Sequence, residues 1–250
     1  MTKLAEQLIT TFSEKKTHGA FWRLSRKTVT QQLRDRVADP FLINQGRAGL
    51  CPSAAVVYGI ARRSRAEYVR MVTELFDRGR TRVSRWDLKP CRDLKSSNPM
   101  GNVPQADWIP MASIRDTENL LFDFQHDSDS GGAGPGELAA WLKKAGYTDV
   151  REDWSNLWHK SKESLSSASG LYENNYHVCL VIDANVLEGQ KKGGGSNHFV
   201  VLRSAATWNP RGGSVDMKVY TWGSLQTMPK NKMDLDEFLP YYYGYVAGKY

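Results

Sequence analysis

The sequence predicts an α+β fold in which helices come first and an antiparallel sheet comes second. Apolar residues recur at helical spacing through much of the first 150 residues. Three segments rich in β-branched and aromatic residues then follow between residues 176 and 222, separated by Gly-rich turns. Helices followed by a run of strands are typical of the α+β class.

Residues 1–40 are predicted to form a helical prelude. The apolar positions at helical spacing are Leu4, Leu8, Ile9 and Phe12. A second helix is expected over about 28–37, and it should end before Pro40, which disfavours a helical conformation in the residue before it.

Residues 41–150 are predicted to form a mainly helical lobe. The segment 52–63 is apolar almost all round, as in a buried helix. Ser64 and Glu67 have the spacing of a capping box that begins the next helix, and Gly79 ends it. A further helix is expected over 136–144, after which Gly146 follows.

Other parts of this region carry weaker signals. The segment 82–86 is compatible with a short strand, and 90–105 has the composition of a loop. Residues 108–124 mix apolar and charged side chains and predict no definite state. The segment 127–135 is predicted to be a flexible surface loop, with a lid as the alternative, and 147–175 a polar connector with a short helix.

The three predicted strands are 176–183, 198–204 and 215–222. The Gly-rich segment 193–197 and the turn 208–213 join them. We expect an antiparallel meander over 176–224, followed by an aromatic C-terminal tail over 225–250. All these parts are predicted to belong to one domain, 1–250.

Composition restricts the class of protein. No run of 18 apolar residues exists, so no membrane span is expected. The N-terminus lacks the apolar core of a signal peptide, which predicts a cytoplasmic protein or export by a signal-independent route. Cys51, Cys91 and Cys179 lie too far apart for a disulfide framework or a zinc site. The net charge of +7 comes from scattered Lys and Arg, which indicates a solvated basic surface and predicts no nucleic-acid partner.

The stretch before the buried helix carries the main functional signal. Cys51 ends a Gly-punctuated turn, and Pro52 is favoured at the first helical position. The unpaired N–H groups and the positive dipole end at a helix N-terminus favour an anion, and so lower the pKa of a thiol there. Gln45 lies six residues before the cysteine, where its amide can reach an oxyanion that forms beside the sulfur.

This stretch resembles the Gln-Gly-x-x-Gly-x-Cys motif of papain-like cysteine peptidases, which precedes a helix. The matching residues are Gln45, Gly46, Gly49 and Cys51. The resemblance implies that Cys51 is the nucleophile and that Gln45 completes the oxyanion hole. Two positions depart from the family pattern, since Ala48 replaces a second Cys and Pro52 replaces an aromatic residue.

A thiol nucleophile needs a base. His18, His126 and His159 lie in polar stretches and are expected at the surface. His177 and His198 each begin or nearly begin a predicted strand, and the resemblance separates them. In papain-like enzymes the catalytic His opens the second strand of this kind, which identifies His198 as the base. The distance from Cys51 along the chain also suits the family range of about 130–150 residues. His177 and Cys179 are then structural.

The third predicted strand ends in a Trp-Gly pair, as it does in papain-like peptidases. The resemblance implies that Trp222 shields the base from water. The family has Asn or Asp at the position that orients the His, whereas this chain has Tyr220. Three possibilities follow: an oxygen of Tyr220 or Thr221, a backbone carbonyl, or a Cys–His dyad.

Strand pairing excludes another candidate for the orienting group. With the turn centred near residue 210, the residue opposite His198 is expected near 222. Asp216 then pairs near Ser204, about six residues along the strand. Asp216 is therefore a poor orienting group.

The resemblance implies a cysteine peptidase that cleaves protein or peptide substrates through a thioester. No metal or cofactor is expected. The chain is most similar to bacterial double-glycine peptidases and to peptidase toxins, which are delivered into target cells without a signal peptide. A toxin of this kind implies a cognate immunity protein as a partner.

Two other functions are compatible with the sequence. A cell-wall amidase or glutamine deamidase uses the same Cys–His pair, and a basic surface suits anionic cell wall. The second is a non-catalytic module that binds through its basic surface or through 238–250, which contains five tyrosines. At that density tyrosines are more typical of a packed edge or interface than of a nucleic-acid stacking surface.

Overall fold

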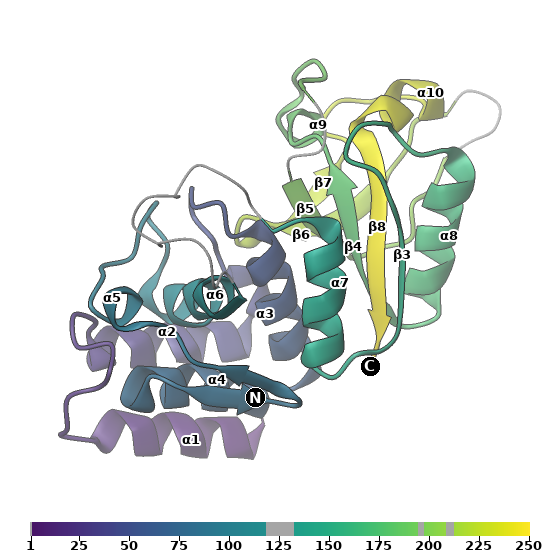
Figure 1. Ribbon diagram of the computed structural model, residues 1–250. Coiled ribbons are helices and arrows are strands. Elements are labelled where there is room, and N and C mark those ends of the chain that lie inside the picture. Colours follow the sequence, from purple (N-terminus) through teal and green to yellow (C-terminus); the bar gives the residue numbers. More distant parts are fainter. Residues whose placement is uncertain (1, 119–132, 195–197, 209–212) are drawn as a thin grey trace. The chain divides into compact units, whose positions relative to one another are not determined.

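The chain folds into two compact units, each with its own core, in a computed structural model. The described residues are 2–118, 133–194, 198–208 and 213–250. Unit 1 contains Met1–Ala133 and Lys144–Gly146, and unit 2 contains Gly134–Lys143 and Tyr147–Tyr250. Unit 1 is mainly helical and unit 2 is built on an antiparallel sheet, so the predicted α+β class is confirmed (Figure 1). The assignment of 1–250 to one papain-like domain stays a prediction.

Helices dominate unit 1. They are α1 (Lys3–Glu14), α2 (Arg26–Ala38), the 3-10 turn η1 (Pro40–Leu42), α3 (Cys51–Arg63), α4 (Arg65–Arg78), α5 (Arg92–Lys95) and α6 (Gln105–Glu118). The helical prelude and the two helices around residues 52–78 are confirmed. Every residue of α3 from 52 to 61 is buried, as its all-round apolar pattern predicts.

The boundary between α3 and α4 follows from the hydrogen bonds around Ser64. The Ser64 side chain accepts from the Glu67 backbone N–H at 3.2 Å and caps α4. Its own N–H already donates to the Ile60 carbonyl, so Glu67 pairs with Arg63 at 2.7 Å and the predicted capping box is only half formed. Gly79 ends α4 in the left-handed region, at φ 64°.

Three weak signals in unit 1 are corrected. The segment 82–86 is not one strand but parts of the hairpin β1 (Thr81–Val83) and β2 (Trp86–Leu88), which turns at Ser84 with a positive φ. The loop over 90–105 contains the short helix α5. Helix α6 covers much of the unassigned segment and contains Pro110, a residue that disfavours a helix interior and hides it from sequence analysis.

Unit 2 contains a six-stranded sheet and several helices. The helices are α7 (Pro135–Lys144), α8 (Lys162–Glu173), α9 (Asn185–Glu188), α10 (Leu235–Phe238) and the 3-10 turn η2 (Leu239–Tyr241). The strands are β3 (Thr148–Trp154), β4 (Tyr176–Ile182), β5 (His198–Leu202), β6 (Met217–Thr221), β7 (Ser224–Met228) and β8 (Tyr242–Lys249). Their order is β3-β8-β4-β5-β6-β7, and all neighbours are antiparallel.

The predicted meander β4-β5-β6 is confirmed. Val201 lies opposite Tyr220, and continuing this register puts residue 223 opposite His198, one position from the prediction. Asp216 forms an isolated bridge with Thr207, toward the far end of the hairpin from His198.

The predictions for 147–175 and 225–250 need correction. The polar connector contains β3 and α8, and the expected aromatic tail contains β7 and β8. Strand β8, the long yellow arrow in Figure 1, lies inside the sheet between β3 and β4. Seven of its eight residues are buried, so the tyrosines here belong to a central strand and not to an edge or a tail.

Helix α8 covers one face of the sheet in unit 2. The main core residues on this face are Leu165, Ala168, Val178, Leu180, Val200, Leu202, Val219 and Ala247. Because side chains alternate along a strand, His198 lies on the same face as Val200 and Leu202.

Some predicted features lie outside the described residues. They are His126, most of the loop 127–135, the end of the Gly-rich segment 193–197 and the centre of the turn 208–213. Within the described ranges, none of the helices combines the length and the apolar character that crossing a bilayer requires.

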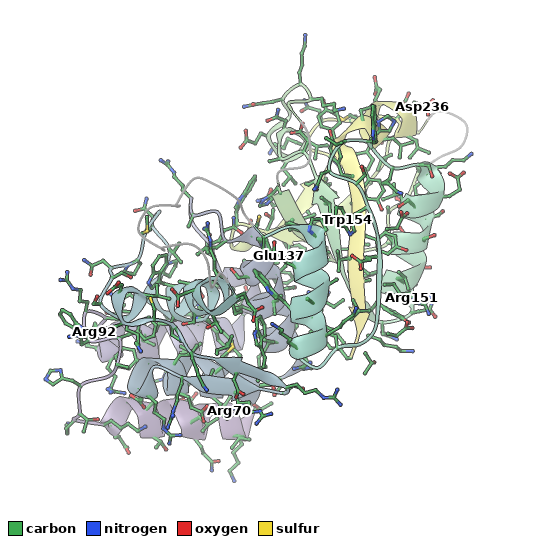
Figure 2. The ribbon with its side chains drawn as sticks, viewed as in Figure 1. Arg70, Arg92, Glu137, Arg151, Trp154 and Asp236 are labelled. Atoms are coloured by element: carbon green, nitrogen blue, oxygen red, sulfur yellow. The ribbon has the colours of Figure 1, made fainter. Side chains whose placement is uncertain are left out.

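A glycine of β8 tests the packing of that strand, and a glycine of α8 serves as the control. At Gly244 on β8, φ is 121° and an added Cβ would lie 2.0 Å from the carbonyl oxygen of Asp153 on the neighbouring strand β3. Figure 2 labels Trp154, the residue that follows Asp153 on β3. Gly244→Ala should lower the free energy of unfolding by about 3 kcal/mol. In α8, nothing lies within 4 Å of a Cβ added to Gly170, so Gly170→Ala should raise it by about 0.5–1 kcal/mol. Urea unfolding followed by circular dichroism measures both, and similar effects of the two variants would contradict the placement of β8.

Candidate functional site

Cys51 is the first residue of the 13-residue helix α3, one position before the predicted start. Its side chain is partly exposed. Leu50 is the N-cap, and its carbonyl accepts from the Ala54 N–H at 2.8 Å and from the Ser53 hydroxyl at 3.0 Å. The sulfur therefore belongs to the first residue of a long buried helix, at the end whose positive dipole stabilises an anion.

The loop 45–51 packs its backbone against another loop of unit 1. The Arg47 N–H donates to the Gly101 carbonyl at 2.7 Å. Gly46 and Gly101 both have positive φ, and a Cβ on Gly46 would lie 2.2 Å from the Gly101 oxygen. Only glycine permits this approach at these two positions. A Cβ on Gly49 would reach nothing nearer than an Arg115 nitrogen at 4.0 Å, so packing does not require that motif glycine.

A buried carboxylate fixes the start of this loop. Asp107 on α6 has no exposed surface and accepts two hydrogen bonds from the Arg36 guanidinium, at 2.8 and 2.7 Å. It also accepts from the Asn44 N–H at 3.0 Å. The Asn44 side chain in turn accepts from the Gly46 N–H at 2.8 Å. These bonds tie α2, α6 and the loop into one rigid assembly.

Gln45 is buried and belongs to the same loop. Its side-chain amide nitrogen donates to the Ala48 carbonyl at 3.3 Å, and the Ala48 N–H donates back to the Gln45 carbonyl at 3.2 Å. An amide nitrogen has two hydrogens, so this bond uses one of them. The amide is thus held in a fixed orientation within the loop that precedes Cys51.

His198 opens β5 and is only 4% exposed. Its Nε2 lies 2.7 Å from the Thr221 hydroxyl oxygen. The ring stacks on Trp222 with centroids 4.7 Å apart and an angle of 25°. Burial disfavours the imidazolium and lowers the pKa of His198 to about 4.

Trp222 occupies an unusual backbone conformation. Trp222 and Gly223 have φ values of 46° and 74° and form the two-residue turn between β6 and β7, where Thr221 pairs with Ser224. Two positive φ values suit the type I′ hairpin turn, in which Asn-Gly is the common choice. A tryptophan at the first position is disfavoured, and such strain is concentrated at functional sites. The strain accompanies the stacking of the indole ring on His198.

The structure brings His198, Thr221 and Trp222 together in unit 2. Tyr220 precedes Thr221 on β6, so its side chain points to the opposite face of the sheet. Within the described ranges, the Thr221 hydroxyl oxygen is at hydrogen-bond distance from His198 Nε2, in agreement with one of the three possibilities for the orienting group. Cys51 and Gln45 belong to unit 1.

Sequence analysis missed Asp183, which follows β4. Its buried carboxylate accepts from the Asn185 N–H at 3.0 Å and from the Gly193 N–H at 2.6 Å. It thereby holds the start of the Gly-rich segment that leads to His198. An Asp at the end of a strand, two residues before a turn Asn, is the local pattern that signals such an anchor.

The other cysteines differ from Cys51. Cys91 is exposed, and its thiol donates to the Asp116 carboxylate at 3.1 Å. Partial burial and this neighbouring carboxylate raise the pKa of Cys91. Cys179 is fully buried in β4, and desolvation strongly raises its pKa. Both should be poorly nucleophilic near neutral pH.

The other described histidines differ from His198. His177 is buried in β4 and packs against the rings of Tyr147 and Tyr250, with centroids 5.4 and 6.3 Å away. His18 and His159 are exposed. In the described part of the chain, no cluster of three His, Cys, Asp or Glu side chains is arranged to hold a metal ion.

Comparison with family models, with curated proteins and with solved structures gives no match for this chain. The residues themselves therefore carry the functional conclusions.

Titration of His198 provides a test of its environment. Its pKa of about 4 lies below the value of about 6.5 in an unfolded chain, so folding favours the neutral ring. Its contribution to stability is complete above about pH 6.5 and is lost as the pH falls from there to about 4. Wild type should lose about 3 kcal/mol more than His198→Gln over this range, measured by urea unfolding.

A second pair of variants isolates the cause of the low pKa. Trp222→Ala exposes the ring and should raise the pKa of His198 toward its ordinary value, as measured by NMR. Thr221→Val removes the hydrogen bond but keeps the ring covered, so the pKa should stay low. An unchanged pKa in Trp222→Ala would contradict the role given to the indole.

Proposed function

We propose that the chain is a papain-like cysteine peptidase, with Cys51 as nucleophile and His198 as general base. The observation that supports this most strongly is the environment of His198. A histidine that is buried, hydrogen-bonded through one ring nitrogen and covered by a tryptophan in a strained turn has the surroundings of a working base. The position of Cys51 at the first residue of α3 supports the role of nucleophile.

The proposal includes an assignment of the two ring nitrogens. The Thr221 hydroxyl can donate or accept, and in the tautomer proposed here Nε2–H donates to its oxygen, so that Nδ1 keeps its lone pair and takes the thiol proton. A pKa of about 4 keeps this ring neutral at neutral pH. Such a weak base needs an acidic partner. A helix N-terminus lowers the pKa of a thiol, and so reduces the difference between the pKa of the thiol and that of the imidazole.

The reaction proceeds in two stages. The Cys51 sulfur attacks the peptide carbonyl carbon and its proton passes to His198, which then protonates the leaving amine as the C–N bond breaks. Water adds to the resulting thioester, His198 takes the water proton, and the sulfur leaves with the acid product released. The Cys51 backbone N–H and the Gln45 amide stabilise the oxyanion, each donor worth a factor of about 10²–10³. This chemistry requires no metal or cofactor.

The biological role proposed with this activity is that of a bacterial toxin or effector. Its substrates are proteins or peptides of a target cell. A cognate immunity protein in the producing cell accompanies an enzyme of this kind. Nucleic acid is not a partner in this proposal.

Thiol labelling tests the catalytic pair. A Cys91→Ser background removes the other exposed thiol, and Cys179 is buried. Labelled with iodoacetamide at about pH 6, Cys51 should react at least about tenfold faster than an ordinary thiol, because a lowered pKa raises its thiolate fraction. His198→Ala should abolish most of this excess, and Thr221→Val should reduce it by misorienting the ring. An ordinary thiol profile in wild type, or one unchanged by His198→Ala, would contradict the pairing.

Substrate digestion separates peptidase from amidase activity. Wild type should release fragments from a panel of purified proteins and leave purified peptidoglycan intact, and Cys51→Ala should release fragments from neither. Mass spectrometry of the products identifies the bond that is cut. Release of stem peptides from peptidoglycan, or conversion of Gln to Glu in intact proteins, would replace peptidase by amidase or deamidase with the same Cys–His chemistry.

A further inference from the structure

Unit 1 contains a basic cavity beside α1 and α2, with a volume of about 600 Å³. Five cations line it: Lys15, Lys16, Arg26, Lys27 and Arg34. Three hydroxyl groups join them, from Ser13, Thr17 and Thr30. Among the lining residues that the structure describes there is no carboxylate and no aromatic ring.

The cations exceed the carboxylates that neutralise them. Asp77 alone serves both Lys15 and Arg26, at 2.6 Å each. Arg34 has a longer contact with Glu6, at 3.5 Å between half-exposed side chains. Lys16 and Lys27 form no ion pair within 4.0 Å of a described carboxylate. Five cations against the two carboxylates of Asp77 and Glu6 leave the cavity an excess of about three positive charges.

Arg26 makes one wall of the cavity rigid. Its guanidinium donates to the Thr17 carbonyl at 2.9 Å and to Asp77, and it lies 4.5 and 4.7 Å from the ring centres of Phe12 and Phe76. These contacts hold the segment after α1 against the first turn of α2. A ligand would meet a wall that is already ordered, which reduces the entropy lost on binding.

Thr30 supplies a second, independent pointer to a ligand. It lines the cavity and is only 5% exposed, yet its buried hydroxyl has no hydrogen-bond partner among the described residues. A buried hydroxyl without a partner costs about 1–3 kcal/mol. Threonine in a helix has two accessible χ1 rotamers, so we expect this hydroxyl to turn toward an acceptor bound in the cavity.

We infer that this cavity binds a small phosphorylated molecule. A phosphate monoester carries up to two negative charges, which match the two lysines that lack a carboxylate partner. Its oxygens accept from ammonium groups and hydroxyls arriving from several directions, as the lining provides. The volume falls in the range of small-molecule sites, about 300–1,000 Å³. The absence of lining aromatic rings favours such a molecule over single-stranded nucleic acid, whose bases stack on them.

This binding is a separate property from the proposed peptidase activity. None of its residues belongs to the loop 45–51 or to unit 2. It can therefore be tested on the whole chain without any substrate.

Calorimetric titration with pyrophosphate tests the site, with sodium chloride controls at equal ionic strength. We expect one saturable site in wild type. Lys16→Glu and Lys27→Glu should each weaken binding about tenfold or more, the loss of one charge-assisted hydrogen bond. Lys89→Glu makes the same charge change at an exposed lysine outside the cavity and should bind as wild type does.

Thr30→Val separates binding from folding. The substitution keeps the shape of the side chain and removes a hydroxyl that has no partner, so the free energy of unfolding should stay equal or rise. Pyrophosphate affinity should nevertheless fall about threefold to tenfold. Three results would overturn the inference: no saturable binding, equal weakening in Lys89→Glu, or tighter and lysine-dependent binding of a DNA oligonucleotide than of pyrophosphate.

Discussion

The pairing of the buried Asp107 carboxylate with Arg36 and the Asn44 N–H is the interaction on which the arrangement of α2, α6 and the Cys51 loop depends. A buried charge costs several kcal/mol unless it is fully paired, and this one is satisfied by Arg36 and by the Asn44 N–H. The three groups come from α6, α2 and the chain just before Gly46, so the carboxylate is satisfied only when all three are in place. The geometry before Cys51 is therefore set by residues remote from it in sequence, and the motif glycine Gly46 permits the close approach of the loop to Gly101.

In unit 2 the same burial that orders His198 also limits its basicity. Desolvation favours the neutral ring, and the Thr221 hydroxyl orients it without supplying the negative charge of a carboxylate. A Thr at this position can fix the tautomer but stabilises an imidazolium less than Asp would. The proposed enzyme would then depend on the acidity of Cys51 more than on the strength of its base. The strained turn at Trp222 fits this arrangement, because it keeps the ring covered.

Local signals explain which elements the sequence predicts. Helices α3 and α4 have clear apolar periodicity and end at Ser64 and Gly79, and β4 to β6 are β-branched runs between glycines. Strand β8 has no such pattern, because it is buried on both faces and its partners, β3 and β4, lie far away in sequence. The candidate site shows the same difference between local and distant signals. The Cys51 and His198 positions follow from short motifs, whereas the choice of Thr221 over Tyr220 depends on which face of β6 a side chain occupies. Asp183 has a local signal in Asn185 two residues later, but the contacts of Asp107 with Arg36 and Asn44 join segments that are far apart in sequence.

The basic cavity could not be predicted from the net charge of +7 either. Lys and Arg are scattered along the chain, yet the pairing of α1 with α2 gathers five of them around one cavity. Helix α2 contributes Arg26 and Thr30 to that cavity and Arg36, near its other end, to Asp107. A ligand that binds only the folded form stabilises it by mass action. An occupied cavity would thus stabilise α2, whose last turn contains Arg36, the partner of Asp107. Helix α2 therefore connects the basic cavity to the carboxylate that fixes the start of the Cys51 loop.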